Sequence, residues 1–307
     1  MSVVCLGELI IDLFAEDHTA SLDKAVHFKR FPGGAPANVA VGLHHHGVPV
    51  TLISRVGNDA SGDFLIHFLK AKGLSTEGIS RDARHRTKIA LVGRDAKGDR
   101  FFEFHNMNSA DQYISVTDIP ENLWDSVRIF HIGGVALLGE TTALTTIHLL
   151  QTLPEDIVVS FDPNIRLELV GNAAVVRMRL QKMLEYVDIL KCSDADFAAL
   201  FGRKEARDFL ENPEKITLLS RGAASTYVHC CGTRLEVPVA PVQAVDTTGA
   251  GDAFMAALLA RVHAWLQEHS LRDATLEEWK QWVEWANFWG TRCVQVQGAL
   301  GCYEKTQ

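Results

Sequence analysis

Short, mainly apolar segments separated by helix-length stretches are the feature that most constrains how this chain can fold. Six of them are VVCLG (3–7), VTLIS (50–54), IFHIGG (129–134), IVVSFD (157–162), DILKC (188–192) and ITLLS (216–220). A strand that is apolar along most of its length needs cover on both faces, which is typical of a parallel sheet with helices on each side. The sequence therefore predicts a three-layer α/β/α fold around a mainly parallel central sheet.

Two regions interrupt this alternation, one at about 12–32 and the other at about 87–114. The second contains DAKGD (95–99), whose residues favour a turn between two strand-like runs. We expect both regions to form half-buried antiparallel strands, which would make a small lid on the α/β body. The chain has neither an internal repeat nor a low-complexity linker, so residues 1–307 are predicted to form a single domain.

Composition excludes several classes of partner. Hydrophobic residues make up 47% of the chain, and the net charge of −8 argues against a nucleic-acid surface, which would need a basic stripe. No apolar run approaches the ~20 residues that span a bilayer, so no membrane partner is expected. The apolar N-terminus carries Glu8 and Asp12 and is interpreted as a buried strand, not as a signal peptide. The six cysteines form no metal or disulfide pattern, which predicts a cytoplasmic protein.

The stretch DTTGAGDAF (246–254) combines a small-residue turn with a carboxylate where a helix is expected to begin. Gly249, Ala250 and Gly251 allow several backbone N–H groups to converge, and the following helix adds the positive end of its dipole. Such an anion hole suits a migrating phosphoryl group. Asp252 could then accept a proton from an attacking hydroxyl, or it could merely cap the helix. The residues by themselves leave both readings open.

Two further helices are predicted nearby. DAFMAALLARVHAWL (252–266) is apolar nearly all round, so we expect it to be buried against the sheet. TLEEWKQWVEWANFW (275–289) begins with a capping box formed by Thr275 and Glu278. The helical spacing of its tryptophans favours core packing over a ligand site; they are Trp279, Trp282, Trp285 and Trp289.

Three consecutive histidines, His44, His45 and His46, raise the question of a metal site. Neighbouring residues on a helix point in different directions, so they cannot all bind one ion. We expect solvated side chains near a helix end.

Four motifs together resemble one known family, the ribokinase-like (PfkB) carbohydrate kinases. DTTGAGDAF resembles its second signature and GGAPANVAVGLHHHG (33–47) its first. GELIID (7–12) resembles the strand that carries the family's sugar-binding aspartate, and DPNIR (162–166) resembles another family segment. The motifs occur in the family order and cover nearly the whole chain. The resemblance implies a ribokinase-like fold and ATP-dependent phosphoryl transfer to a sugar hydroxyl.

The resemblance also implies roles on the sugar side. Asp12 and Asn38 would hold sugar hydroxyls, while Gly33 and Gly34 would let the backbone approach the sugar. Asp252 would be the general base beside the anion hole of Gly249, Ala250 and Gly251. Each residue also has a plainer alternative, such as a strand-end polar group, an ordinary turn or a helix cap. Further substrate contacts are implied for Phe104, Asn106 and Arg166.

On the nucleotide side the resemblance implies binding of ATP and Mg²⁺. LKCSDADFAALFG (190–202) places Ser193 and Asp196 where the family often has an Asn-x-x-Glu segment. Because aspartate is shorter than glutamate, Mg²⁺ is expected near Asp196 through water, with no direct protein ligand. Asn287 would lie near the adenine, or alternatively on the outer face of its helix. The remaining implied ATP-binding residues are Asn164, Lys191, Ser220, Gly222, Gly249 and Gly251.

The segment FFEFHNMNSADQYI (101–114) bears on the substrate. The 2-keto-3-deoxygluconate kinases of the family usually carry a Tyr-x-Arg there, whereas this chain has Phe104, His105 and Asn106. A neutral sugar is therefore expected, and the motifs look most like those of fructokinases. A keto-deoxy acid is the alternative, because Arg166 could still serve a carboxylate; ribose or a nucleoside comes third.

Two other classes of protein are disfavoured by the sequence. A dinucleotide-binding oxidoreductase is disfavoured because CLGELI lacks G-x-G-x-x-G after the first strand. A non-catalytic sugar-binding relative would more readily have lost Asp252, which is present. The resemblance further implies a homodimer through the lid strands and allows K⁺ near residues 291–301.

Overall fold

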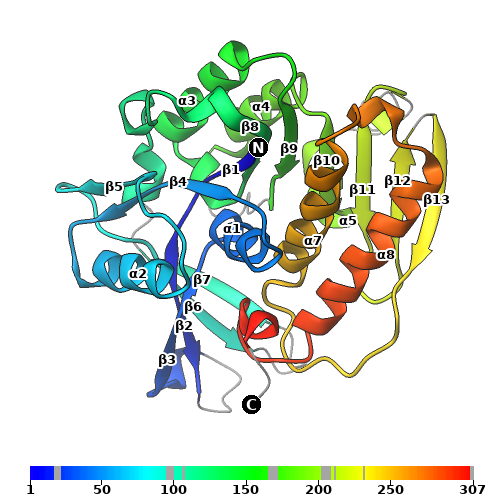
Figure 1. Cartoon of the computed structure of the whole chain (residues 1–307). Helices are drawn as coiled ribbons and strands as arrows, with labels where there is room; N and C mark the ends of the chain where they lie inside the picture. The colour runs from blue at the N-terminus through cyan, green and yellow to red at the C-terminus, as the bar shows by residue number, and fades with distance from the viewer. Residues whose placement is uncertain are drawn as a thin grey trace.

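The computed structural model describes residues 1–16, 22–94, 100–105, 108–164, 172–201, 209–210, 212–230 and 232–304. A nine-stranded sheet runs through the centre in the order β13-β12-β11-β10-β9-β8-β1-β4-β5 (Figure 1). Its neighbouring strands pair in parallel from β11 to β5, whereas β12 near the other edge runs antiparallel to both of its neighbours, β11 and β13. Their bounds are β1 Ser2–Leu6, β4 Val50–Gly57, β5 Ile79–Asp82, β8 Val127–Gly133, β9 Val158–Asp162, β10 Ile189–Ser193, β11 Ile216–Ser220, β12 Ser225–Cys230 and β13 Thr233–Pro238.

The six segments expected to be buried strands form β1, β4, β8, β9, β10 and β11, so the predicted parallel sheet is confirmed. Strand β1 shows why its sequence is apolar throughout. Val3 and Cys5 belong to the hydrophobic core on one face of the sheet, while Val4 and Leu6 belong to the core on the other. Both faces are therefore covered, as the three-layer prediction requires.

Helices cover the two faces in separate groups. One group holds α1 (Ala35–His45), α2 (Ala60–Ala71), α7 (Ala250–Trp265) and α8 (Leu276–Cys293), and the other holds α3 (Glu140–Thr152), α4 (Ala173–Leu184) and α5 (Asp194–Leu200). Short 3₁₀ helices are η1 Leu22–Lys24, η2 Ala110–Tyr113, η3 Val116–Asp118, η4 Leu123–Ser126, η5 Val135–Leu138, η7 Leu271–Asp273 and η8 Gly301–Tyr303. Among the described residues no helix combines the length and the hydropathy needed to cross a membrane.

A second, four-stranded sheet lies beside the carboxyl ends of the central strands (Figure 1). This small sheet has the order β3-β2-β6-β7, with bounds β2 Ile10–Ala15, β3 Phe28–Gly33, β6 Ile89–Arg94 and β7 Arg100–His105. The two hairpins are antiparallel as expected, but β2 and β6 join them in parallel, which the sequence did not predict. The expected turn at 95–99 lies outside the described residues.

The tryptophan-rich helix α8 begins as predicted. Thr275 and Glu278 form the capping box, with the Thr275 backbone N–H donating to Glu278 Oε2 over 2.7 Å. The side chains of Trp279, Trp282 and Trp289 are buried in the core, which confirms the packing interpretation.

The histidine triplet lies at the end of α1. His44 and His45 are exposed as expected, but the ring of His46 packs edge-on against Trp289, with 4.8 Å between ring centroids. Burial lowers the pKa of His46 to about 4, so this residue is neutral at physiological pH. The prediction of a solvated side chain is wrong for His46, because α8 covers it.

Candidate active site

Two adjoining cavities lie where the carboxyl ends of β1, β9 and β10 meet the amino ends of α1 and α7. Open α/β sheets commonly bind ligands at this position. The smaller cavity has a volume of about 330 Å³ and the larger about 740 Å³. Asn164, Lys191, Thr247 and Gly251 line both cavities and so mark the boundary between them.

The smaller cavity gathers most of the residues implied for sugar binding. Asp12, Gly34, Asn38, Phe104 and Asp252 line it, although they are spread over more than two hundred residues of sequence. Asp12 comes from β2 and Phe104 from β7, so the small sheet closes one side of this cavity. Phe102, which the sequence analysis did not single out, also lines it.

Gly33 and Gly34 allow a close approach of two segments. A Cβ at Gly33 would fall 2.3 Å from Asp12 Oδ2, and one at Gly34 would fall 2.3 Å from the Glu8 carbonyl oxygen. Gly34 also has φ +106°, which L-residues rarely adopt. The pair therefore sets the first turn of α1 directly against the residues that follow β1.

Asp252 lies in the first turn of α7, facing the smaller cavity. Asn38 Nδ2 donates a hydrogen bond to Asp252 Oδ2 over 2.8 Å, and both side chains are buried. Asn38 lies on α1, so packing of α1 against α7 fixes the carboxylate toward the cavity. A buried carboxylate held in this way can accept a proton from a hydroxyl bound in the cavity.

The amino end of α7 forms the turn expected to hold an anion. Gly249 adopts φ +78°, and a Cβ there would fall 2.4 Å from Ala299 Cβ. The Ala253 N–H donates to the Gly249 carbonyl oxygen over 2.8 Å, an i to i−4 bond at the start of α7. The amides of Gly251 and Asp252 precede this bond and belong to the first turn of the helix. These amides and the positive end of the dipole lie at the boundary of the two cavities.

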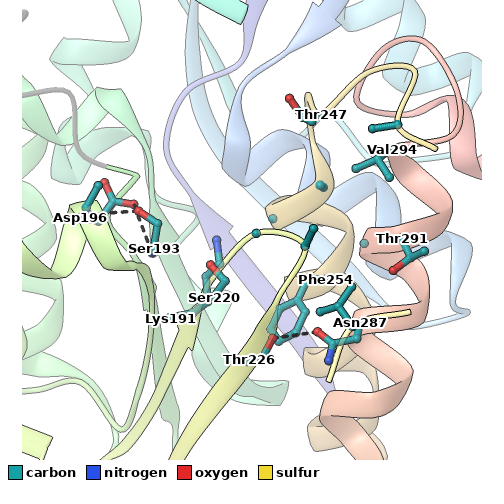
Figure 2. A pocket seen from close by; sticks show the side chains of 18 of the residues that line it. Lys191, Ser193, Asp196, Ser220, Thr226, Thr247, Phe254, Asn287, Thr291 and Val294 are labelled. Atoms are coloured by element: carbon teal, nitrogen blue, oxygen red, sulfur yellow. Dashed lines mark hydrogen bonds between the residues drawn. The ribbon is translucent and has the colours of Figure 1, made fainter. Parts of the chain in front are cut away.

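The larger cavity brings together the residues implied for ATP binding (Figure 2). It lies between α5, β11 and the facing ends of α7 and α8, and its wall is apolar around Val239, Val242 and Phe254. The residues implied for ATP binding that line it are Asn164, Lys191, Ser193, Asp196, Ser220, Gly222, Gly251 and Asn287, and Ala250 of the turn also lines it. Gly249 was implied for ATP binding as well, but it lines the smaller cavity.

Asn287 lines the larger cavity and also makes hydrogen bonds that join α8 to β12 and β13. Its side chain is buried, accepts a hydrogen bond from Thr226 Oγ1 over 2.8 Å (Figure 2) and donates to the Pro238 carbonyl oxygen over 3.4 Å. The alternative of an outer-face polar residue is therefore wrong, because α8 turns this position toward β12 and β13.

The nucleotide side offers oxygen donors that fit a hydrated Mg²⁺. Ser193 Oγ donates to Asp196 Oδ2 over 2.7 Å within the cap of α5 (Figure 2), and both residues line the larger cavity. In the part of the chain that the structure describes, no group of three or more histidine, cysteine, aspartate or glutamate residues could hold an ion. Mg²⁺ usually keeps several water ligands and is bound mainly by substrate phosphates. A few oxygen donors near the phosphates, such as Ser193 and Asp196, are therefore enough to fit a hydrated ion.

Two buried acidic residues of the site were missed in the sequence. Glu8 Oε1 accepts from the Ala35 N–H over 3.0 Å and Oε2 from the Ala136 N–H over 3.2 Å, and Glu8 lines the smaller cavity. Burial raises its pKa to about 7. Asp162 Oδ2 accepts from Lys191 Nζ over 2.7 Å. Glu8 lies in GELIID and Asp162 in DPNIR. A carboxylate in or beside an apolar strand was the sequence signal that could have identified both residues.

Two of the residues implied for substrate contact are not placed by the structure. Asn106 and Arg166 lie outside the described residues.

Asp246, the first residue of DTTGAGDAF, is buried and connects the turn to the loop that follows α8. Its carboxylate accepts from the Thr248 N–H over 2.9 Å and from the Gly298 N–H over 2.6 Å.

The chain matches the pfkB carbohydrate kinase family over residues 1–305. It is 33% identical over 309 residues to the probable fructokinase-6, chloroplastic, of Arabidopsis thaliana, covering 97% of this chain and 78% of that protein.

Two solved structures are similar over nearly the whole chain. Fructokinase from Xylella fastidiosa with bound ATP has a TM-score of 0.86 at 28% identity, covering 98% of this chain and 94% of that one. A fructokinase double mutant from Vibrio cholerae O395, with fructose, ADP and potassium bound, has a TM-score of 0.85 at 27% identity, covering 99% and 95%. The chain therefore belongs to the pfkB family of carbohydrate kinases and is an ATP-dependent sugar kinase.

Proposed function

We propose that this kinase transfers the γ-phosphoryl group of ATP to a primary hydroxyl of fructose. The observation that carries the proposal is the lining of the smaller cavity, where Asp12, Asn38 and Asp252 offer acceptors and a donor for hydroxyl groups. Lys191 is the only cation among the described residues that line it, and it is paired with Asp162. A neutral sugar suits such a lining better than a sugar acid does. The fructokinase relatives support the same choice.

In the proposed mechanism Asp252 is the general base. Asn38 holds its carboxylate toward the sugar hydroxyl, which loses its proton to Asp252 as it attacks the γ-phosphorus. The amides of the Gly249–Gly251 turn stabilise the charge that develops on the phosphoryl oxygens. Mg²⁺ bound with ATP would neutralise part of the phosphate charge. Among the described residues, those that would hold its water shell are Asn164, Ser193 and Asp196.

The small sheet is proposed to act as a lid. Phe102 and Phe104 face the smaller cavity from β7, and Asp12 faces it from β2. Covering the sugar with these side chains would exclude water and limit hydrolysis of ATP.

Four accessory features belong to the proposal. A monovalent cation, K⁺, would bind near the loop 291–301, which Asp246 ties to the active-site turn through Gly298. A homodimer would form through the lid strands, which sedimentation velocity can test. Residues 1–307 would act as one domain, and the protein would work in the cytoplasm.

The test is ADP release from Mg-ATP with fructose, 2-keto-3-deoxygluconate, ribose, adenosine and fructose 6-phosphate. Fructose should be turned over best. Asp252→Asn should lower kcat by ~10²–10⁴, the range expected for loss of a general base. Asp59→Asn is a matched control, because Asp59 caps α2 and lies on neither cavity.

Three outcomes would count against parts of the proposal. Preference for the keto-deoxy acid would overturn the neutral-sugar assignment. An unchanged kcat in Asp252→Asn would remove Asp252 from the mechanism. Sugar binding without ADP release in the folded protein would indicate a non-catalytic relative.

A further inference from the structure

We propose that Lys191 is a catalytic residue whose ammonium group contacts the phosphoryl group as it passes from the nucleotide to the sugar. The inference rests on the proposed function, because it needs the sugar in the smaller cavity and ATP in the larger. It assigns a specific step to a residue that the family resemblance places only in ATP binding.

Lys191 lies at the boundary between the two cavities. It lies on β10 and lines both cavities, as do Asn164, Thr247 and Gly251 (Figure 2 shows it in the larger cavity). A phosphoryl group that leaves one cavity for the other must cross this boundary. Among the described residues that line either cavity, Lys191 is the only lysine or arginine.

The charge of Lys191 is maintained by its surroundings. Its side chain is 9% exposed, and Nζ donates to Asp162 Oδ2 over 2.7 Å. Burial by itself would lower the pKa of Lys191, but the charge and hydrogen bond of Asp162, with the charges of Asp252 and Asp196, raise it overall. An ammonium has three N–H donors, and the bond to Asp162 uses one of them.

The ammonium also lies against the anion-binding turn. A Cβ built on Gly251 would be 2.7 Å from Lys191 Nζ, so the cation touches the first turn of α7. A fixed cation and backbone N–H groups at one boundary form a preorganised site for negative charge. The glycine at 251 leaves the space in which the two can approach the same anion.

In this step the sugar oxygen forms a bond to the γ-phosphorus while the bond from that phosphorus to the ADP oxygen breaks. The hydroxyl proton moves to Asp252. Lys191 neither gains nor loses a proton. It stabilises the transferring oxygens more strongly in the transition state than in the ground state, which is what raises kcat.

A purely structural ion pair is the competing explanation, and the chain contains a matched control for it. Lys88 Nζ donates to Asp111 Oδ2 over 2.7 Å, and both side chains are buried, but neither residue lines the two cavities. Lys191→Met and Lys88→Met therefore remove the same charge from the same kind of pair.

The experiment measures binding of ADP and of AMP-PNP by calorimetry, both with Mg²⁺ and without sugar, and then kcat and KM for fructose. Lys191→Met should weaken AMP-PNP binding by about tenfold more than ADP binding, because only AMP-PNP carries a γ-phosphoryl group. It should lower kcat by ~10²–10³ with little change in the KM for fructose. Lys88→Met should lower Tm and leave the ratio of the two nucleotide affinities unchanged.

Lys191→Arg keeps the charge and the pairing with Asp162, so it provides a folded variant if Lys191→Met does not fold. It should retain the ratio of AMP-PNP affinity to ADP affinity that is measured for the wild type. The proposal is overturned if Lys191→Met keeps kcat within about fivefold of wild type, or if Lys191→Arg changes the ratio of the two nucleotide affinities as much as Lys191→Met does. Since nucleotide binding is measured without sugar, failure of the wild type to use fructose would instead count against the proposed substrate.

Discussion

Glu8 and Asp252 line the same cavity but have different chemical surroundings. Glu8 is 2% exposed and accepts from two backbone N–H groups, and burial nevertheless raises its pKa to about 7. Asp252 instead accepts from the Asn38 side chain and borders the boundary with the larger cavity. The two carboxyl groups are thus suited to different tasks, with Glu8 joining β1, α1 and η5 and Asp252 facing the smaller cavity.

Glu8 makes stability depend on pH in a defined direction. Its pKa rises from 4.5 to about 7 on folding, so between these values the folded protein binds more protons than the unfolded chain. Folding stability should therefore fall as pH rises through this window, by about 3 kcal/mol in total from this group. Glu8→Gln should reduce the difference in unfolding free energy between pH 5 and pH 8, measured by urea denaturation.

The exposed Glu121→Gln variant serves as the control for this measurement. It should keep the pH dependence of the wild type. If Glu8→Gln keeps it as well, Glu8 does not titrate in this range.

At the scale of elements, the start of α7 depends on a single glycine. Gly249 and Gly47 have nearly the same backbone angle, φ +78° and φ +76°. A Cβ at Gly47 would meet nothing within 4 Å, whereas one at Gly249 would fall 2.4 Å from Ala299 Cβ. A comparison of the two positions therefore separates the cost of backbone strain from the cost of close packing, which sets the position of the proposed anion-binding turn.

Gly47→Ala should cost about 1–2 kcal/mol of unfolding free energy, the usual cost of a left-handed L-residue. Gly249→Ala should cost about 1–3 kcal/mol more, because overpacking adds to the same strain. It should also abolish most of the activity by displacing the amides of the turn. Urea denaturation and kcat measure the two effects, and equal losses in the two variants would contradict this account.

The elements that the sequence predicted share a local signal. Continuous apolar runs marked the buried parallel strands, and a capping box marked the start of α8. Strands β12 and β13 were missed, and β13 shows why: its residues are mostly exposed or half-exposed, so they form no continuous apolar run. The parallel contact between β2 and β6 joins two distant hairpins and has no local signal either.

At the scale of the whole molecule, a buried ion pair connects the small sheet to the central body. Lys88 directly precedes β6, its carbonyl oxygen accepts from the Ile11 N–H of β2 over 3.0 Å, and its ammonium donates to Asp111 of η2. Ser109 Oγ also donates to Asp111, over 2.5 Å. The orientation of the proposed lid therefore depends on a fully desolvated pair.

Breaking this pair on one side should be costly. Lys88→Met should lower the unfolding free energy by about 3–5 kcal/mol, because it leaves the Asp111 carboxylate buried without its cation. The double variant Lys88→Met with Asp111→Leu should recover most of that loss, since neither charge then remains buried. Urea denaturation of the three proteins tests the argument. A loss below about 1 kcal/mol in the single variant, or no recovery in the double one, would contradict it.

By itself, the sequence determined the class of fold, the family and most residues of the candidate site, because each rests on a short segment whose residue types carry the information. Apolar runs, a capping box and the small-residue turn at 249–251 are of this kind. Only the tertiary structure decided which side chains meet. Asn38 bonds to Asp252 across 214 residues of chain, and Lys191 pairs with Asp162 from a neighbouring strand. Packing of distant elements sets such contacts, and burial sets the charge state of Glu8, so no local pattern could specify either.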